Sequence, residues 1–244
     1  MTLDTSTTVR ELAVCEPGAT RIFEKLKIDY CCGGARTLED ACAAAGLKTE
    51  DVRRLLEETK VLEAHGAEAI DFQSASLTEL VKYILDKHHV FTKEEMERLN
   101  ALLEKVCNVH GQNHTELLRV KALFQSLCAD LKPHMFKEEQ VLFPYIIRLE
   151  EAVNRKQMPF PPPFGTVRNP VRMMMLEHDT AGELLREMRE ASSNYAAPAD
   201  ACISYRTLYQ ALEAFERDLH QHIHLENNIL FPRAAEMESA ACSV

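Results

Sequence analysis

The chain has 244 residues, enough to bury one large hydrophobic core or two smaller ones. Its 38 acidic and 28 basic residues give a formal charge of -10, which disfavours nucleic acid and anionic lipid as partners. No apolar run approaches the roughly 18 residues that span a bilayer, and the first residues lack the basic and apolar regions of a signal peptide. We therefore expect a cytoplasmic protein with no membrane and no nucleic-acid partner.

Cysteine usage and the scarcity of strand signals narrow the fold class. Eight cysteines at irregular spacing, in a reducing compartment, indicate thiols or ligands rather than a disulfide framework. The chain has no Trp, only eight Gly and no alternating β-branched runs, which makes strands scarce. The sequence therefore predicts an all-α protein.

Residues 1–63 are expected to form a small N-terminal helical domain. A capping-box pattern begins at Thr8 and a near match to it begins at Thr37, each just ahead of helix-spaced apolar residues. Between them lies Asp-Tyr-Cys-Cys-Gly-Gly, residues 29–34. The adjacent Cys31 and Cys32 on a glycine turn near a helix start predict exposed sulfur with a favoured thiolate. A tight turn with one buried cysteine fits the spacing equally well.

A second domain is predicted over residues 76–244, after a polar linker at 64–75. Four long amphipathic helices fit its apolar spacing: from about residue 77 toward 106, from about 115, from an N-cap at Asn169 with Pro170 in the first turn, and around 208–230. Pro133 predicts a kink or a 3₁₀ turn before residue 134. The proline-rich run at 158–170 cannot be helical across its three consecutive prolines and is expected to be a surface crossover.

One pattern, His-x-x-x-Glu-x-x-x-Leu-Phe-Pro, begins at His134 and again at His222. Residues four apart share a helix face, so His134 pairs with Glu138, and His222 with Glu226, in each apolar stripe. Two imidazoles and two carboxylates facing inward suit iron or another first-row transition metal better than magnesium or calcium. Ordinary surface pairs are the alternative, and the inward placement disfavours them.

Other histidines are assigned by helical periodicity. His178 lies on the apolar stripe of the third helix, whereas His220 and His224 point roughly 200° away from the pair on the fourth helix and are interpreted as surface residues. On the first helix, periodicity centres His88 on the apolar stripe and places His89 at its edge. Periodicity alone would therefore favour His88 as the inward residue.

The cysteine-glycine segment resembles the N-terminal domain of the iron-sulfur cluster repair di-iron proteins, and the two repeated motifs resemble their hemerythrin-like domain. The resemblance covers nearly the whole chain and implies an up-down four-helix bundle with a di-iron centre. The family pattern has an aromatic residue before the first ligand, which selects His89 over His88. The implied centre holds two iron ions per chain, oxo- or hydroxo-bridged when diferric, with Glu138 and Glu226 as bridging carboxylates. The implied metal ligands are His89, His134, Glu138, His178, His222 and Glu226.

Two further carboxylates are candidates for supporting this centre. Asp130 lies one turn before His134 on the predicted inward face, and Glu177 is adjacent to His178. Either could hydrogen-bond a ligand or guide iron out of the site, and ordinary solvated charge is the alternative for both.

By resemblance, the protein repairs iron-sulfur clusters damaged by oxidative or nitrosative stress, by donating iron. Cys31 and Cys32 would act in thiol transfer or redox steps, and the expected partners are damaged iron-sulfur proteins, with nitric oxide or oxygen as small ligands. Two alternatives need the same metal ligands: a protein that sequesters nitric oxide or oxygen, and a nitric oxide reductase. The sequence therefore leaves open whether the protein is an enzyme.

Overall fold

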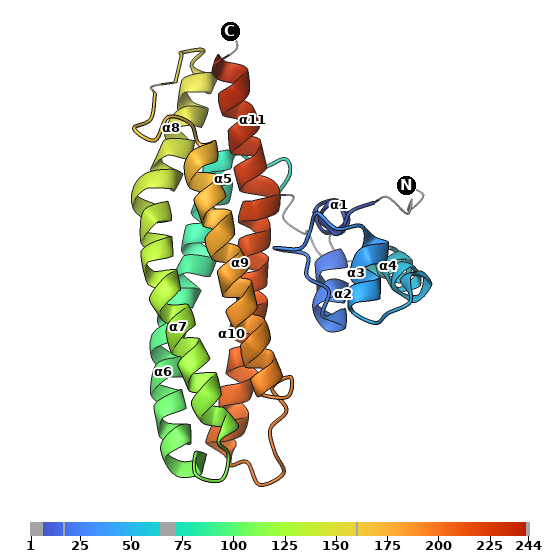
Figure 1. The fold of residues 1–244 in the computed structure, drawn as a ribbon. Coiled ribbons are helices and arrows are strands. Elements are labelled where there is room, and N and C mark those ends of the chain that lie inside the picture. The colour runs from blue at the N-terminus through green and yellow to red at the C-terminus, as the bar shows by residue number, and fades with distance from the viewer. Residues whose placement is uncertain (1–6, 17, 64–71, 160, 243–244) are drawn as a thin grey trace. The chain divides into compact units, whose positions relative to one another are not determined.

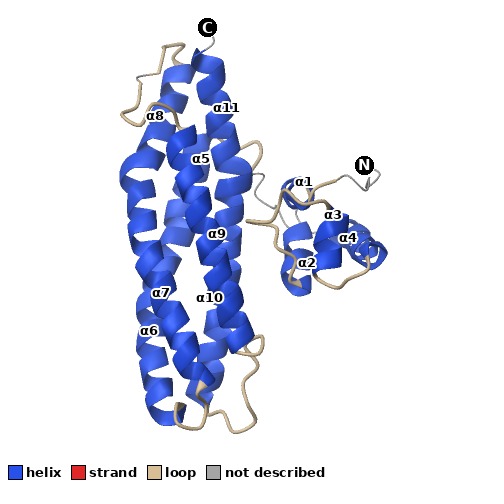
Figure 2. Cartoon of the chain, in the orientation of Figure 1, coloured by secondary structure: helices blue, strands red, loops and turns tan. Residues whose placement is uncertain are grey.

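The computed structural model describes residues 7–16, 18–63, 72–159 and 161–242. Its elements over these ranges are helices, as predicted, with a single isolated bridge between Thr8 and Thr37 (Figure 2). Across the same ranges, no helix is both long enough and apolar enough to cross a bilayer. Contacts divide the chain into two compact units, one comprising Met1–Ser76 with His220–Arg233 and the other comprising Leu77–Leu219 with Ala234–Val244.

The N-terminal part of the first unit contains four helices, whose starts the capping residues explain. The Thr8 hydroxyl accepts a hydrogen bond from the Glu11 backbone N–H at 3.2 Å, and the Glu11 carboxylate accepts one from the Thr8 N–H at 2.8 Å. Thr37 caps the third helix in the same way, accepting from the Asp40 N–H at 3.1 Å. Both predicted caps are confirmed. The helices are α1 (Val9–Cys15), α2 (Ala19–Leu26), α3 (Leu38–Ala44) and α4 (Thr49–Glu63).

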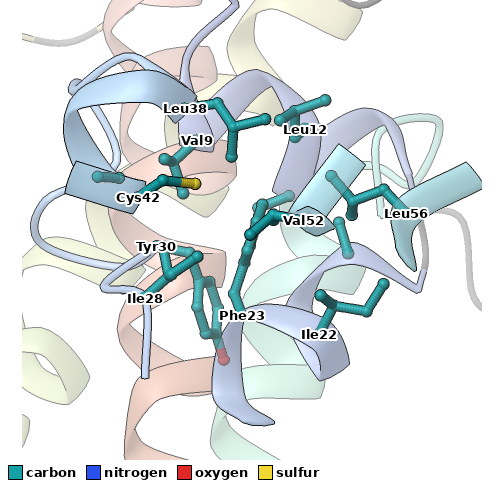
Figure 3. Close-up of a cluster of buried hydrophobic side chains, with 13 residues drawn as sticks. Val9, Leu12, Ile22, Phe23, Ile28, Tyr30, Leu38, Cys42, Val52 and Leu56 are labelled. Atoms are coloured by element: carbon teal, nitrogen blue, oxygen red, sulfur yellow. The ribbon is translucent and has the colours of Figure 1, made fainter. Parts of the chain in front are cut away.

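A small hydrophobic core joins these four helices. Phe23 and Val9 are fully buried at its centre, and Tyr30 brings the cysteine-glycine segment into the same core (Figure 3). Each fully buried aliphatic or aromatic side chain stabilises the fold by about 1.5–3 kcal/mol. A domain of about 60 residues buries a smaller share of its surface than a larger domain does, so this gain exceeds the loss of chain entropy on folding only by a small margin. The expected linker at 64–75 lies outside the described residues over 64–71.

The second unit is built from long helical rods joined end to end from shorter elements (Figure 1). α7 packs along both α6 and α9, and α5 packs against α8, which agrees with the predicted bundle. The segment His220–Arg233, assigned to the first unit, continues the last rod. The rods comprise α5 (Leu77–Tyr83), η1 (Ile84–His89) and α6 (Val90–His110); α7 (Glu116–Lys137), η2 (Glu138–Leu142) and α8 (Phe143–Asn154); α9 (Arg168–Ala191); and α10 (Ile203–Leu225), η3 (Glu226–Leu230) and α11 (Phe231–Cys242).

Two local predictions in this unit need correction. α7 runs as an α-helix through Pro133, so of the predicted kink or 3₁₀ turn before residue 134 the 3₁₀ turn does not form. Pro133 and Ala129 are both exposed, and water can therefore bind the Ala129 carbonyl whose partner N–H the proline lacks. α9 begins at Arg168 rather than after an Asn169 cap, because the carboxylate of Glu238 accepts the Val167 N–H at 2.9 Å. The proline-rich crossover is non-helical at residues 161–163, as predicted.

Candidate metal centre

Three π-helical segments, η1, η2 and η3, mark the positions of predicted metal ligands. η1 ends at His89, η2 begins at Glu138 and η3 begins at Glu226. A π segment bonds residues five apart and so inserts one residue relative to the α-helical register. The extra residue in η1 rotates the following residues relative to an ideal α-helix and so changes which of them face inward. A strict 3.6-residue period does not include this rotation and therefore favours His88. The structure buries both histidines, His88 at 3% and His89 at 1% exposed.

The Leu-Phe-Pro part of the repeated motif accounts for two of these segments. The Phe143 N–H bonds to the Glu138 carbonyl five residues back, and the Phe231 N–H bonds to the Glu226 carbonyl in the same way. The next residue in each copy is a proline, which has no N–H to place. The hydrogen-bond ladder can therefore change register at that point without leaving a backbone donor unpaired.

The structure brings all six predicted ligands into two overlapping groups of buried side chains. The ligand atoms of His89, Glu138, His222 and Glu226 lie within 4.8 Å of one another. Those of His134, Glu138, His178 and Glu226 do so as well. The two carboxylates, each 0% exposed, are the members common to both groups. We call these six residues the His/Glu cluster.

Two histidines of the cluster are oriented by carboxylates outside it. Nδ1 of His134 lies 2.7 Å from Glu177, and Nδ1 of His89 lies 2.7 Å from Glu139. The opposite nitrogens point into the cluster, with Nε2 of His134 at 3.3 Å and Nε2 of His89 at 3.5 Å from the carboxylate of Glu138. His222 likewise directs Nε2 toward Glu226, at 3.1 Å.

The charge state of the two outer carboxylates fixes the histidine tautomers. Burial raises the pKa of Glu139, but hydrogen bonds from Lys93 and His89 outweigh that effect, and the pKa lies below its ordinary value. The pKa of Glu177 is lowered by the same balance, through Lys137 and His134. An ionised carboxylate can only accept a hydrogen bond, so each Nδ1 carries the proton and donates it. In the neutral imidazole, each Nε2 then has a lone pair directed at the cluster.

The donor set and its spacing fit six-coordinate transition-metal ions. Nε2 of His134 and Nε2 of His178 are 3.0 Å apart. Two nitrogens bound at a right angle through bonds of about 2.1 Å are separated by about 3.0 Å, whereas a tetrahedral angle would separate them by about 3.4 Å. Burying two carboxylates is costly unless cations compensate them, and neutral imidazoles with carboxylates are a common ligand set for iron.

The structure places the two candidate supporting groups differently. Glu177 contacts the cluster histidine His134, so it stays a candidate for a group that orients a ligand. Asp130 is exposed to solvent, so its predicted inward placement is wrong. Glu139 is not among the residues that the sequence pattern singles out, although its position directly after Glu138 parallels the position of Glu177 directly before His178.

The neighbouring histidines have other partners. Nδ1 of His88 lies 3.1 Å from the carboxylate of Asp218, so this buried histidine forms an ion pair or hydrogen bond away from the cluster. His220 and His224 were both predicted to be surface residues. The prediction is wrong for His224, which is 4% exposed, and His220 is only partly exposed. Within the first unit, His220 contacts Glu24 at 2.8 Å and His224 accepts a hydrogen bond from Asn228 at 2.8 Å.

The cysteine-glycine turn differs from the expectation of two exposed thiolates. Cys31 is 4% exposed and Cys32 is half-buried. A hydrogen bond with Cys32, together with burial and the nearby negative charge of Asp29, raises the pKa of the Cys31 thiol. The alternative of a tight turn with one buried cysteine describes this segment correctly.

Comparisons with known proteins match both parts of the chain. Residues 80–234 match the hemerythrin HHE cation-binding domain, and residues 5–60 match ScdA_N, a domain of unknown function. A probable iron-sulfur cluster repair protein from Haemophilus influenzae is 37% identical over 91% of this chain and 94% of its own length. The iron-sulfur cluster repair protein YtfE from Yersinia pseudotuberculosis is 34% identical over 93% of this chain and 96% of its own length. The protein of the same name from Musicola paradisiaca is 34% identical over 94% of this chain and 96% of its own length. The chain therefore belongs to the iron-sulfur cluster repair family, with a hemerythrin HHE cation-binding domain preceded by an ScdA_N domain.

Proposed function

We propose that the protein is a cytoplasmic di-iron protein that repairs iron-sulfur clusters damaged by oxidative or nitrosative stress, by donating iron to them. The single observation that carries this proposal is the buried His/Glu cluster, in which two carboxylates are common to two groups of ligand atoms. The names of the relatives, which describe iron-sulfur cluster repair proteins, support the same function. Damaged iron-sulfur proteins are then the partners.

In the proposed site, Glu138 and Glu226 would bridge two iron ions. His89 and His222 would complete the ligands of one ion, and His134 and His178 would complete those of the other. Six side chains do not fill the coordination of two six-coordinate ions, so exchangeable positions remain on both. The oxygen-carrying hemerythrins have a further histidine one turn after the ligand of the third helix, where this chain has Gly182. Bound iron would thus supply both a releasable metal and a place for nitric oxide or oxygen to bind.

The residues around the cluster favour holding iron in a defined but releasable form. Glu139 and Glu177 keep two imidazoles in the metal-binding tautomer, and both carboxylates are partly exposed. Each therefore connects a buried ligand with solvent, and we assign them as oxygen ligands along the exit route of iron. Cys31 and Cys32 are proposed to take part in thiol transfer or redox steps of the repair.

Transfer of labelled iron tests this function. The protein is loaded with ⁵⁷Fe(II) without oxygen and mixed with a client protein whose [4Fe–4S] cluster has been damaged by nitric oxide. Repair predicts that ⁵⁷Fe appears in the restored cluster and that client activity returns. Stoichiometric iron-nitrosyl without iron transfer would instead indicate sequestration of nitric oxide, and catalytic formation of nitrous oxide would indicate a reductase. Either result without iron transfer contradicts the proposal.

A further inference from the structure

The Asp-Tyr-Cys-Cys-Gly-Gly turn brings together three side chains that can bind a metal, none of which belongs to the His/Glu cluster. Oδ1 of Asp29 accepts hydrogen bonds from the backbone N–H groups of Cys31 and Cys32, at 3.1 and 2.9 Å. These bonds hold the carboxylate over the turn, 3.4 Å from Sγ of Cys31. The two sulfur atoms are 3.8 Å apart. The ligand atoms of the three residues all lie within 4.8 Å of one another.

The two glycines of the motif leave little room for a side chain. A Cβ atom on Gly33 would lie 3.0 Å from Oδ2 of Asp29 and 3.2 Å from the Asp29 carbonyl oxygen. A Cβ atom on Gly34 would lie 2.9 Å from the Tyr30 carbonyl oxygen, which is closer than normal contacts allow. Gly33 thus leaves space for the Asp29 carboxylate beside the two cysteines, and Gly34 lets the turn pass close to the Tyr30 carbonyl.

We propose that Asp29, Cys31 and Cys32 form a second metal site that binds one divalent ion of the ferrous or zinc class. Two sulfurs bound tetrahedrally through bonds of about 2.3 Å are separated by about 3.8 Å, and an oxygen and a sulfur by slightly less. The distances of 3.8 and 3.4 Å therefore match two edges of one tetrahedron. Thiolate ligands also distinguish this site chemically from the His/Glu cluster, because they select softer ions.

The site has the features of one that exchanges its ion. Three protein ligands leave a fourth position open, as in zinc sites that bind water or substrate. Asp29 is exposed and Cys32 is half-buried, so the position can be reached from solvent. Binding requires no oxidant: the ion displaces the two thiol protons to solvent and forms two metal–sulfur bonds. The inference depends on the proposed repair function only for the choice of iron as the natural ion.

Cobalt(II) is the probe that separates the two sites in the full-length chain. The metal-free, fully reduced protein is titrated with Co²⁺ without oxygen, after a thiol count has established that its cysteines are reduced. Sulfur-to-cobalt charge transfer absorbs in the near ultraviolet, and the His/Glu cluster contains no sulfur. We expect this band to saturate at one Co²⁺ per chain. Cys32→Ser should abolish the band and remove one bound Co²⁺ per chain.

Matched variants make the assignment specific. Asp29→Asn keeps an oxygen that can accept both backbone hydrogen bonds but loses the negative charge, so it should weaken cobalt binding at least tenfold without unfolding the turn. Cys15→Ser and Cys202→Ser remove exposed cysteines and should leave the band unchanged. Glu226→Ala should reduce the metal bound by the His/Glu cluster and also leave the band intact, so failure of that cluster cannot be mistaken for failure of this site.

The opposite pattern would overturn the inference. Absence of the band in the reduced wild-type protein, or its persistence in a Cys32→Ser variant with native helicity, would show that the turn binds no metal through its thiols. Loss of the band in Cys202→Ser would assign the sulfur ligand to another part of the chain.

Discussion

Nδ1 of His134 lies 2.7 Å from Oε2 of Glu177, and this contact sets the tautomer in which His134 directs Nε2 into the His/Glu cluster. Glu177→Gln should therefore weaken iron binding by about 10–100-fold, because the neutral amide no longer enforces the donor role of Nδ1. Equilibrium titration of the metal-free protein with Fe²⁺ without oxygen measures the change. Glu183→Gln on the same helix is the control, since Glu183 is exposed and contacts only Arg186 among the ion pairs described for α9. Equal affinities for the two variants would remove Glu177 from the site.

His88 and His89 should respond differently to truncation. His89→Ala is expected to lower the iron content, because Nε2 of His89 lies within the His/Glu cluster. His88→Ala should leave two irons per chain but reduce the free energy of unfolding by roughly 2–4 kcal/mol, through the loss of a buried side chain and its contact with Asp218. Metal analysis and urea unfolding of both variants test this. Loss of iron only in His88→Ala would mean that the simple helical period identifies the ligand correctly.

A structural carboxylate far from the cluster should affect stability alone. Glu238 accepts hydrogen bonds from the Tyr145 hydroxyl at 2.5 Å, from the Thr166 hydroxyl and from the Val167 N–H. Glu238→Ala should cost roughly 2–4 kcal/mol, because it leaves buried donors without an acceptor. The exposed Glu236→Ala should change the unfolding free energy by less than about 0.5 kcal/mol. Iron content should be unchanged in both, and iron loss in Glu238→Ala would show that the helix ends and the metal centre are coupled.

The N-terminal domain should be dispensable for metal binding but required for repair. All six residues of the His/Glu cluster lie after Ser76, so a fragment of residues 76–244 is expected to bind two irons and to lose iron transfer to a damaged client. Iron analysis and the ⁵⁷Fe transfer assay measure the two properties on the same sample. A fragment that stays helical by circular dichroism yet binds no iron would place the functional boundary elsewhere.

Local sequence patterns predicted the features that depend on residues close together in the chain. The spacing His-x-x-x-Glu identified the two His–Glu pairs that lie in the His/Glu cluster, and the capping residues Thr8 and Thr37 identified two helix starts. What the sequence did not reveal depends on residues far apart. Glu150 binds the Leu77 N–H from 73 positions away at 2.8 Å, and no local pattern encodes such a cap.

Register and burial account for the remaining errors. A π segment adds one residue to a helix, so periodicity alone placed His88 rather than His89 at the centre of the inward face. Helical periodicity places His224 on the surface because it considers only the helix that carries this residue. In the structure His224 is buried, and it belongs to a unit that also contains the N-terminal helices. Cys31 is also buried, and its carbonyl accepts a hydrogen bond at 3.3 Å from Asn227 of the same unit, a residue far away in the sequence.

The most direct measurement of the central claim is the iron content and Mössbauer spectrum of ⁵⁷Fe-loaded wild-type and Glu226→Ala proteins. If Glu138 and Glu226 each join two metals, the wild-type protein should hold two irons per chain with the spectrum of a spin-coupled pair. Glu226→Ala should lose the coupled spectrum and at least one iron, whereas Glu150→Ala, another buried glutamate, should keep both. Two coupled irons persisting in Glu226→Ala, or a single uncoupled iron in the wild-type protein, would contradict the account.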